Sequence, residues 1–116
     1  MNQAKLYNLD RLSQYVGNDA NQLNEMINIF LDTIPQDIDQ LQKLANKEKW
    51  DKVYETAHRI KPSVDVFEMD EVLVDIKRIE KLAHENNIEN NLVELIKKLS
   101  EKFNVIILLL QKELEK

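Results

Sequence analysis

His58 and Lys61 are the residues of this 116-residue chain whose types and spacing could do chemistry. Helical spacing places them one turn apart, and His58 lies roughly 120° from the centre of the apolar stripe on its own helix. A solvent-facing imidazole is a nucleophile, and an ammonium group one turn away can hold an anion. The pair therefore predicts a nucleophile beside an anion site, without the rest of a catalytic apparatus.

Several kinds of active site are disfavoured by the residues that surround this pair. The chain has one Gly, so a glycine-rich phosphate loop is not expected, and neither is intrinsic use of ATP. A hydrolytic triad is disfavoured because no oxyanion turn accompanies the histidine. With two His and no Cys, no familiar metal-ligand spacing occurs, and we expect no cofactor or metal on this chain. His84 is interpreted as an ordinary surface histidine.

Composition and charge indicate an acidic helical protein. A net charge of −5 argues against a nucleic-acid partner, and the absence of Cys excludes a disulfide framework. Met1 opens into polar sequence without a secretory signal, and the apolar run at 105–110 is too short to span a bilayer. We therefore expect one domain over residues 1–116, located in the cytoplasm without membrane attachment.

Apolar spacing predicts a short helix followed by four longer ones. The first helix is expected at 6–16 and ends at Gly17, and the second is capped by Asn18 or Asp19 and bent or split at Pro35. The third is expected at 50–67. The fourth is capped by Asp70 and frays at Asn86 and Asn87, and the last begins at about Glu89. Short connections favour antiparallel neighbours. The predicted fold is an all-α, antiparallel up-and-down four-helix bundle with a short N-terminal helix.

The segment Ala57-His58-Arg59-Ile60-Lys61-Pro62-Ser63 resembles the Ala-His-x-Leu-Lys-Gly-Ser pattern of histidine phosphotransfer (HPt) domains of bacterial two-component phosphorelays. Phe30 with Leu41, the approach at 50–58 and the return helix at 69–80 are also similar, so the likeness covers essentially the whole chain. The chain departs from the family at two glycines, which are replaced here by Pro62 and Glu68. Pro62 should bend the helix just past His58, and Glu68 adds bulk and charge near the helix end.

The resemblance implies that His58 accepts a phosphoryl group from a phosphoaspartate on one receiver domain and passes it to another. Lys61 would offset the charge of the bound phosphate. The receiver would bring the aspartate, the magnesium ion and its own lysine, and a hybrid sensor histidine kinase is a further expected partner. The domain would thus be a phosphocarrier without kinase activity. A fragment of a hybrid kinase is compatible with the sequence, but Met1 and the charged end at Lys116 favour a free protein.

Receiver docking is expected on the surface around His58, formed by two helices. The candidates are Tyr54, Arg59, Pro62 and Asp65 from the helix of His58, and Asp32, Thr33 and Gln36 from the helix before it.

Two other functions are compatible with the sequence. A helical adaptor could bind a receiver or kinase domain without carrying phosphate. Alternatively, the protein could be a structural helical oligomer, because the run at 105–110 is apolar on every helical face and could form a contact between copies of the chain. We expect the first helix to cover this excess and the protein to be a monomer.

Overall fold

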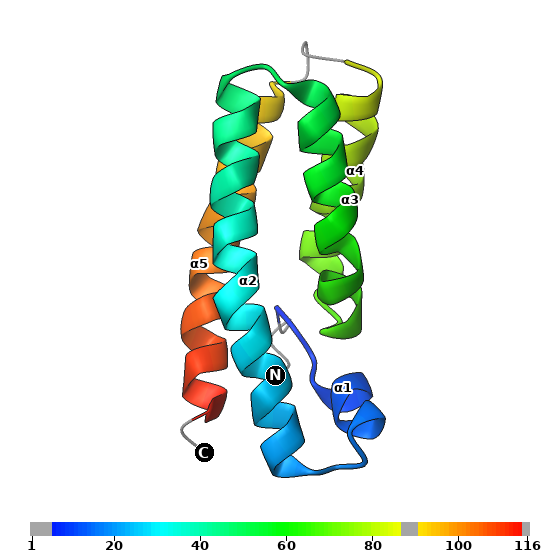
Figure 1. The fold of residues 1–116 in the computed structure, drawn as a ribbon, viewed down its shortest axis with the longest axis vertical. Coiled ribbons are helices and arrows are strands. Elements are labelled where there is room, and N and C mark those ends of the chain that lie inside the picture. The colour runs from blue at the N-terminus through cyan, green and yellow to red at the C-terminus, as the bar shows by residue number, and fades with distance from the viewer. Residues whose placement is uncertain (1–5, 87–90, 115–116) are drawn as a thin grey trace, which may run out of the picture.

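All regular structure is helical in the part of the chain that the computed structural model describes, residues 6–86 and 91–114 (Figure 1). The elements are α1 (Asp10–Tyr15), α2 (Ala20–Asn46), α3 (Trp50–Val66), α4 (Asp70–His84) and α5 (Leu92–Leu114). The prediction of an all-α protein is confirmed. The predicted helix start at Glu89 and the predicted fraying at Asn87 lie outside the described residues.

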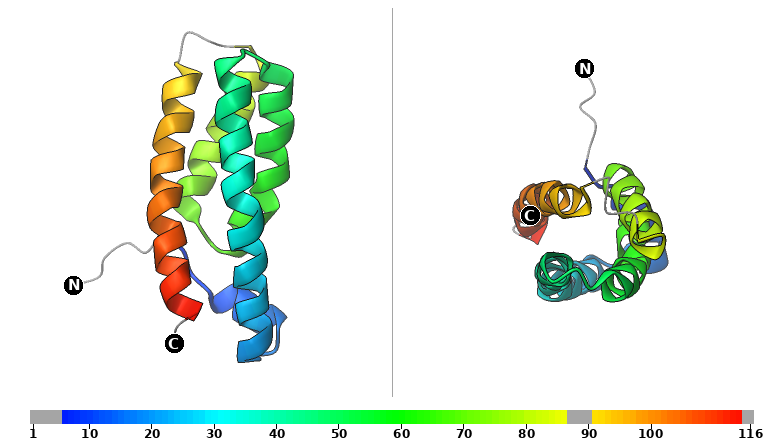
Figure 2. Two further views of the ribbon diagram at one scale, coloured as in Figure 1. Left: turned by 60° about the vertical axis from the view of Figure 1, so that its left-hand side comes forward. Right: turned by 90° about the horizontal axis from the view of Figure 1, so that it is seen from above.

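The four long helices surround one core. α3 packs against α4, α4 against α5, α5 against α2, and α2 against α3. Figure 2 shows this closed order of neighbours from above. The short helix α1 packs against α2 at one end of the molecule, below α3 in Figure 1. The site therefore depends mainly on how α3 meets α4.

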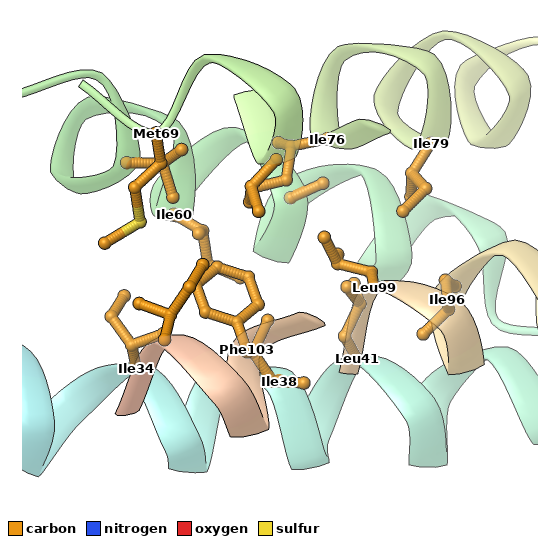
Figure 3. Packing of buried hydrophobic residues seen from close by; sticks show 14 of the residues in the cluster. Ile34, Ile38, Leu41, Ile60, Met69, Ile76, Ile79, Ile96, Leu99 and Phe103 are labelled. Carbon is orange, nitrogen blue, oxygen red and sulfur yellow. The ribbon is translucent and has the colours of Figure 1, made fainter. Parts of the chain in front are cut away.

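The core is mainly aliphatic, as the low aromatic content predicts. Figure 3 shows Ile34 and Ile38 of α2, Ile76 of α4 and Leu99 of α5 converging on the interior, and all four are buried. The aromatic part of the core is Phe30, whose ring centroid lies 4.5 Å from that of Phe67 and 6.4 Å from that of Phe103. Burial of these stripes holds the helices together, because isolated helices of this length are marginal in water.

The predicted core needed correction at its edges. The apolar spacing of the sequence places Met26 on the inward stripe of the second helix, but Met26 is 37% exposed. Leu23, Trp50, Leu73 and Leu95 are only partly buried against the core. Other buried residues lie outside the stripes that spacing predicts, among them Val72, Leu82 and Ile96. Each long helix touches two others, so its buried stripe is wider and turned from the single stripe that periodicity predicts.

Two predicted features at the start of the chain are confirmed and one is wrong. Gly17 has a φ of +61° and follows α1, as expected of a left-handed stop. The carboxylate of Asp19 caps α2 by accepting hydrogen bonds from the backbone N–H groups of Asn21 and Gln22. The first helix, however, begins at Asp10 rather than at Leu6.

The predicted cap at Asp70 is wrong. Met69 occupies the N-cap position of α4 and makes no side-chain capping bond, while Asp70 is the first helical residue. Met69 is fully buried, so burial of its side chain determines where the chain turns into α4. Asp70 still places a negative charge in the first turn, where the helix dipole favours it.

Neither proline interrupts its helix. Pro35 lies inside the continuous α2, so the prediction of a split helix is wrong there. Pro62 lies inside α3, which continues to Val66. In each case buried residues flank the proline, Ile34 and Ile38 in α2 and Ile60 and Val64 in α3. Their burial outweighs the loss of one backbone hydrogen bond.

Glu68 occupies a position that favours glycine. Its φ is +50°, directly after the C-cap of α3, and the N–H of Met69 donates to the carbonyl of Val64. Glu48 repeats this geometry after α2 with a φ of +56°. A left-handed residue with a Cβ is strained, which explains why a glycine is the natural choice at such helix ends.

The apolar run at 105–110 is not fully covered. Val105 is 48% exposed and Leu108 is 61% exposed, whereas Ile106 and Leu110 are buried. The expectation that the first helix covers the excess is therefore wrong, because α1 packs against α2.

The segment before α1 reaches α5 instead, through Tyr7. Its hydroxyl donates a hydrogen bond of 3.0 Å to Oε1 of Glu113. Burial, together with this hydrogen bond and the charge of Glu113, raises the pKa of Tyr7 to about 12. The tyrosine therefore stays protonated and keeps donating to the carboxylate.

Candidate functional site

His58 projects from the middle of α3 toward solvent. Its side chain is 62% exposed, whereas the adjacent Ala57 and nearby Ile60 are buried in the core. The same helix thus anchors its apolar side firmly and presents the imidazole on its outer side. The ring is accessible to a large partner, yet it is attached to a rigid element.

A carboxylate from the neighbouring helix holds the imidazole. Nδ1 of His58 lies 2.6 Å from Oε2 of Glu80 on α4, and Nζ of Lys61 donates to the other oxygen, Oε1, at 2.8 Å. The Glu80 side chain is 14% exposed, and that of Lys61 is 29% exposed. One carboxylate therefore bridges the two residues that the sequence singled out.

Glu80 remains ionised at neutral pH. Burial by itself raises the pKa of this carboxyl, but the hydrogen bonds and charges of Lys61 and His58 outweigh burial and lower the pKa below its ordinary value of 4.5. An ionised carboxylate only accepts hydrogen bonds. The proton between the two side chains therefore belongs to Nδ1 of His58, so in the neutral imidazole Nε2 carries the free lone pair.

Tyr54 and His84 complete the surroundings of the imidazole. The ring centroids of Tyr54 and His58 are 6.0 Å apart, with planes inclined by 15°. The ring of His84, on α4, lies 5.2 Å from the same tyrosine. His84, interpreted from the sequence as an ordinary surface residue, is thus part of the cluster around His58.

The sequence analysis missed Glu80, although a signal for it exists. His58 precedes Met69 by as many residues as Glu80 follows it, and Met69 lies at the turn between α3 and α4. Tyr54 and His84 are related in the same way. Residues equidistant from the turn between two packed helices face each other at one level. Aligning the two predicted helices as antiparallel neighbours about the turn at Met69 would have identified both pairs, His58 with Glu80 and Tyr54 with His84.

The remaining docking candidates on α3 are exposed, and two of them form ion pairs. Arg59 contacts Asp37 of α2 at 2.8 Å, and Asp65 lies 3.6 Å from Arg11 of α1. Arg11 also donates to the backbone carbonyl of Asp65. Pro62 is exposed one turn beyond His58 and lacks the N–H that would bond the carbonyl of His58.

Arg11 also reaches Glu68, the second departure from the family pattern. The guanidinium of Arg11 lies 3.7 Å from the Glu68 carboxylate, and the backbone N–H of Arg11 donates to that carboxylate at 3.4 Å. The side chain that replaces a glycine therefore links α1 to the end of α3.

The candidates on α2 are exposed but direct polar atoms to their own helix. The hydroxyl of Thr33 donates to the carbonyl of Ile29 at 2.8 Å, and the amide of Gln36 donates to the carbonyl of Asp32 at 3.0 Å. Within the described part of the chain, these three candidates form no hydrogen bond or ion pair with His58, Lys61 or Glu80. They lie on the helix that Arg59 reaches through Asp37.

Two general features complete the description of the site and the chain. Among the described residues, no group of three or more His, Asp or Glu side chains could hold a metal ion. None of the described helices combines the length and the apolarity needed to cross a membrane.

The arrangement is an accessible imidazole with one nitrogen fixed by a carboxylate and the other presented to a partner. Comparison with curated proteins and with solved structures gives no match. The family model described as Hpt domain matches residues 25–115, which is most of the chain and includes α3 and α4. The chain belongs to the Hpt domain family, whose members carry out histidine phosphotransfer in phosphorelays.

Proposed function

We propose that His58 accepts a phosphoryl group from an aspartyl phosphate of one receiver domain and passes it to a second receiver domain. The observation that carries the proposal is the contact of 2.6 Å between Nδ1 of His58 and the ionised Glu80. In the neutral imidazole this contact places the proton on Nδ1 and leaves the lone pair on Nε2 of an exposed side chain, which is the form that a nucleophile requires. The proposal treats residues 1–116 as one domain, with α2 to α5 as an antiparallel up-and-down bundle.

The transfer step needs little from this chain beyond position and charge. The lone pair of Nε2 attacks phosphorus, the Nε2–phosphorus bond forms, and the bond from phosphorus to the aspartyl oxygen breaks with its electron pair left on the carboxylate. When the neutral imidazole attacks, no proton has to leave Nε2, because the single ring proton is on Nδ1. The positive charge that develops on the ring is offset by Glu80.

The second half of the relay reverses these bonds. A carboxylate oxygen of the next receiver attacks phosphorus, and the electron pair of the Nε2–phosphorus bond returns to Nε2. Lys61 can contact the phosphoryl oxygens while one of its three N–H groups remains on Glu80. The magnesium ion belongs to the receiver in this scheme, so the chain works without a cofactor of its own.

The proposed docking surface surrounds His58. It includes Arg59, Pro62 and Asp65 of α3 with Asp32, Thr33 and Gln36 of α2, and Tyr54 lies at its edge. A monomer acting in the cytoplasm, fed by a hybrid sensor histidine kinase, is the setting that we propose.

Incubation with a receiver carrying radiolabelled phosphoaspartate tests the proposal. The wild type should take up label that is acid-labile and base-stable, and His58→Gln should take up none while keeping its helical circular dichroism. Persistent acid-labile label on His58→Gln would show that another residue carries the phosphate. Receiver binding without any transfer to the wild type would support the alternative, a helical adaptor that carries no phosphate.

A further inference from the structure

We infer that Tyr54 and His84 are positioning residues that orient the imidazole of His58 for phosphoryl transfer. This inference rests on the proposed function. It starts from the contact in which the ring of Tyr54 lies nearly parallel to the imidazole, with centroids 6.0 Å apart and planes inclined by 15°. His84 then contacts the same tyrosine ring at 5.2 Å, with planes inclined by 40°.

The hydrogen bond to Glu80 does not fix the imidazole completely. It constrains one distance, from Nδ1 to the carboxylate oxygen, whereas the ring turns about two bonds, Cα–Cβ and Cβ–Cγ, so a coupled twist about these bonds remains free. With 62% of the His58 side chain exposed, solvent does not resist that twist. A ring packed beside the imidazole face opposes it, because twisting would break the near-parallel contact.

The direction of the Nε2 lone pair depends on this twist. In-line transfer requires the lone pair to point along the axis through phosphorus and the leaving oxygen, so a loosely held ring loses reactive encounters. Glu80 determines where Nδ1 lies, and Tyr54 determines the plane in which Nε2 points. Together they define the approach path on the surface of the protein.

His84 supports the tyrosine from α4. It follows Glu80 by one helical turn, so both side chains leave α4 on the same face. Tyr54 itself is half-buried and packs against the core. α4 therefore contributes twice, directly through Glu80 and indirectly through His84 and Tyr54.

A docking role for Tyr54 makes different predictions from a positioning role. A residue that only contacts the receiver changes affinity and leaves the free protein unaltered. A positioning residue changes the transfer rate at saturating receiver and alters the imidazole even when no receiver is present. The two roles therefore separate in kinetics and in spectroscopy.

The test compares Tyr54→Ala, Tyr54→Leu and Tyr54→Phe with the control Glu55→Ala, an exposed neighbour on α3 that pairs with Lys52. Nitrogen NMR of the His58 side chain in the free, unphosphorylated protein reports its tautomer and ring mobility. Single-turnover transfer from a phosphorylated receiver, measured over a range of receiver concentrations, reports affinity and saturating rate. Tyr54→Leu keeps apolar bulk at this half-buried site and removes only the ring.

We expect Tyr54→Ala and Tyr54→Leu to lower the saturating rate about tenfold, whatever their effect on affinity, and to increase the ring mobility of His58. Tyr54→Phe should restore both readouts, because the contact is made by the ring. His84→Ala should act in the same direction by about threefold, and His84→Phe should restore the rate.

An unchanged His58 spectrum in Tyr54→Ala and Tyr54→Leu would overturn the inference, and so would a loss confined to receiver affinity. Because the NMR readout needs no phosphate, it tests positioning even if the wild type carries none. Failure of the wild type to accept label would overturn the proposed function separately.

Discussion

Nδ1 of His58 and Oε2 of Glu80 lie 2.6 Å apart, although 22 positions separate the two residues in the chain. The contact exists because α3 and α4 turn back on each other at the buried Met69. It converts an exposed histidine into an oriented one and ties it to Lys61 through a shared carboxylate. The most direct predictions concern this carboxylate.

Glu80→Gln should slow phosphoryl uptake by His58 about 10- to 100-fold. The amide keeps the shape of the side chain but no longer enforces the proton on Nδ1 or offsets the charge that develops on the ring. Single-turnover transfer from a phosphorylated receiver measures the effect, with Glu55→Gln as the matched control on the exposed side of α3. A rate equal to that of the wild type would remove Glu80 from the mechanism.

Glu80 should also make stability depend on acid pH. Its pKa in the folded protein is lowered from 4.5, so its ionised form stabilises the fold above that value. This contribution is lost as the pH falls through the folded-state pKa. Urea unfolding at pH 7 and at steps toward pH 3 should show the stability gap between wild type and Glu80→Gln closing in acid. A gap that stays constant across this range would contradict the assigned shift.

Lys61→Ala should slow transfer severalfold without unfolding the protein, because the phosphoryl group loses the nearest ammonium and Glu80 loses one of its two partners. Lys61→Arg keeps the charge and should recover part of the rate. The measurement is the same single-turnover assay, with circular dichroism to verify the fold. Unchanged kinetics in Lys61→Ala would mean that the lysine serves only to hold Glu80.

Glu48→Gly should raise the free energy of unfolding by about 1 kcal/mol, since glycine adopts the left-handed conformation there without strain. Glu68→Gly should gain less, because it also removes the contacts of the carboxylate with Arg11. Urea unfolding of both variants measures the difference. As a control, Lys47→Gly, at a residue with a φ of −93°, should not stabilise the protein. Equal gains at Glu48 and Glu68 would show that the contacts with Arg11 contribute nothing.

Phe103→Ala should cost about 3–5 kcal/mol of stability, because Phe103 is 1% exposed and its removal leaves a cavity beside Phe30. Val105→Ala, two positions along on the exposed side of α5, should change the stability by less than about 0.5 kcal/mol. The pair is compared by urea unfolding. A small loss at Phe103 would indicate that the four helices can close around the void.

Periodicity alone predicted the number of helices, most of the core and the exposure of His58, because these depend on spacing within one helix. The caps show the limit of such local reasoning. Asp19 caps α2 as predicted, since the N–H groups that donate to its carboxylate belong to the next few residues, whereas Asp70 does not cap α4, because burial of Met69 determines where the chain turns. Pro35 does not split α2 for the same reason, since its local cost is small beside the burial of the residues around it.

The sequence by itself determined that a histidine and a lysine stand one turn apart on an outer helix face, with a motif that belongs to phosphotransfer domains. It did not disclose what holds the imidazole. Only the tertiary structure decided that Glu80 fixes Nδ1, that Lys61 shares this carboxylate, and that His84 contacts the tyrosine that packs beside the ring. The physical reason is that these contacts cross from α3 to α4, and their register is determined by core packing around the turn rather than by spacing within either helix.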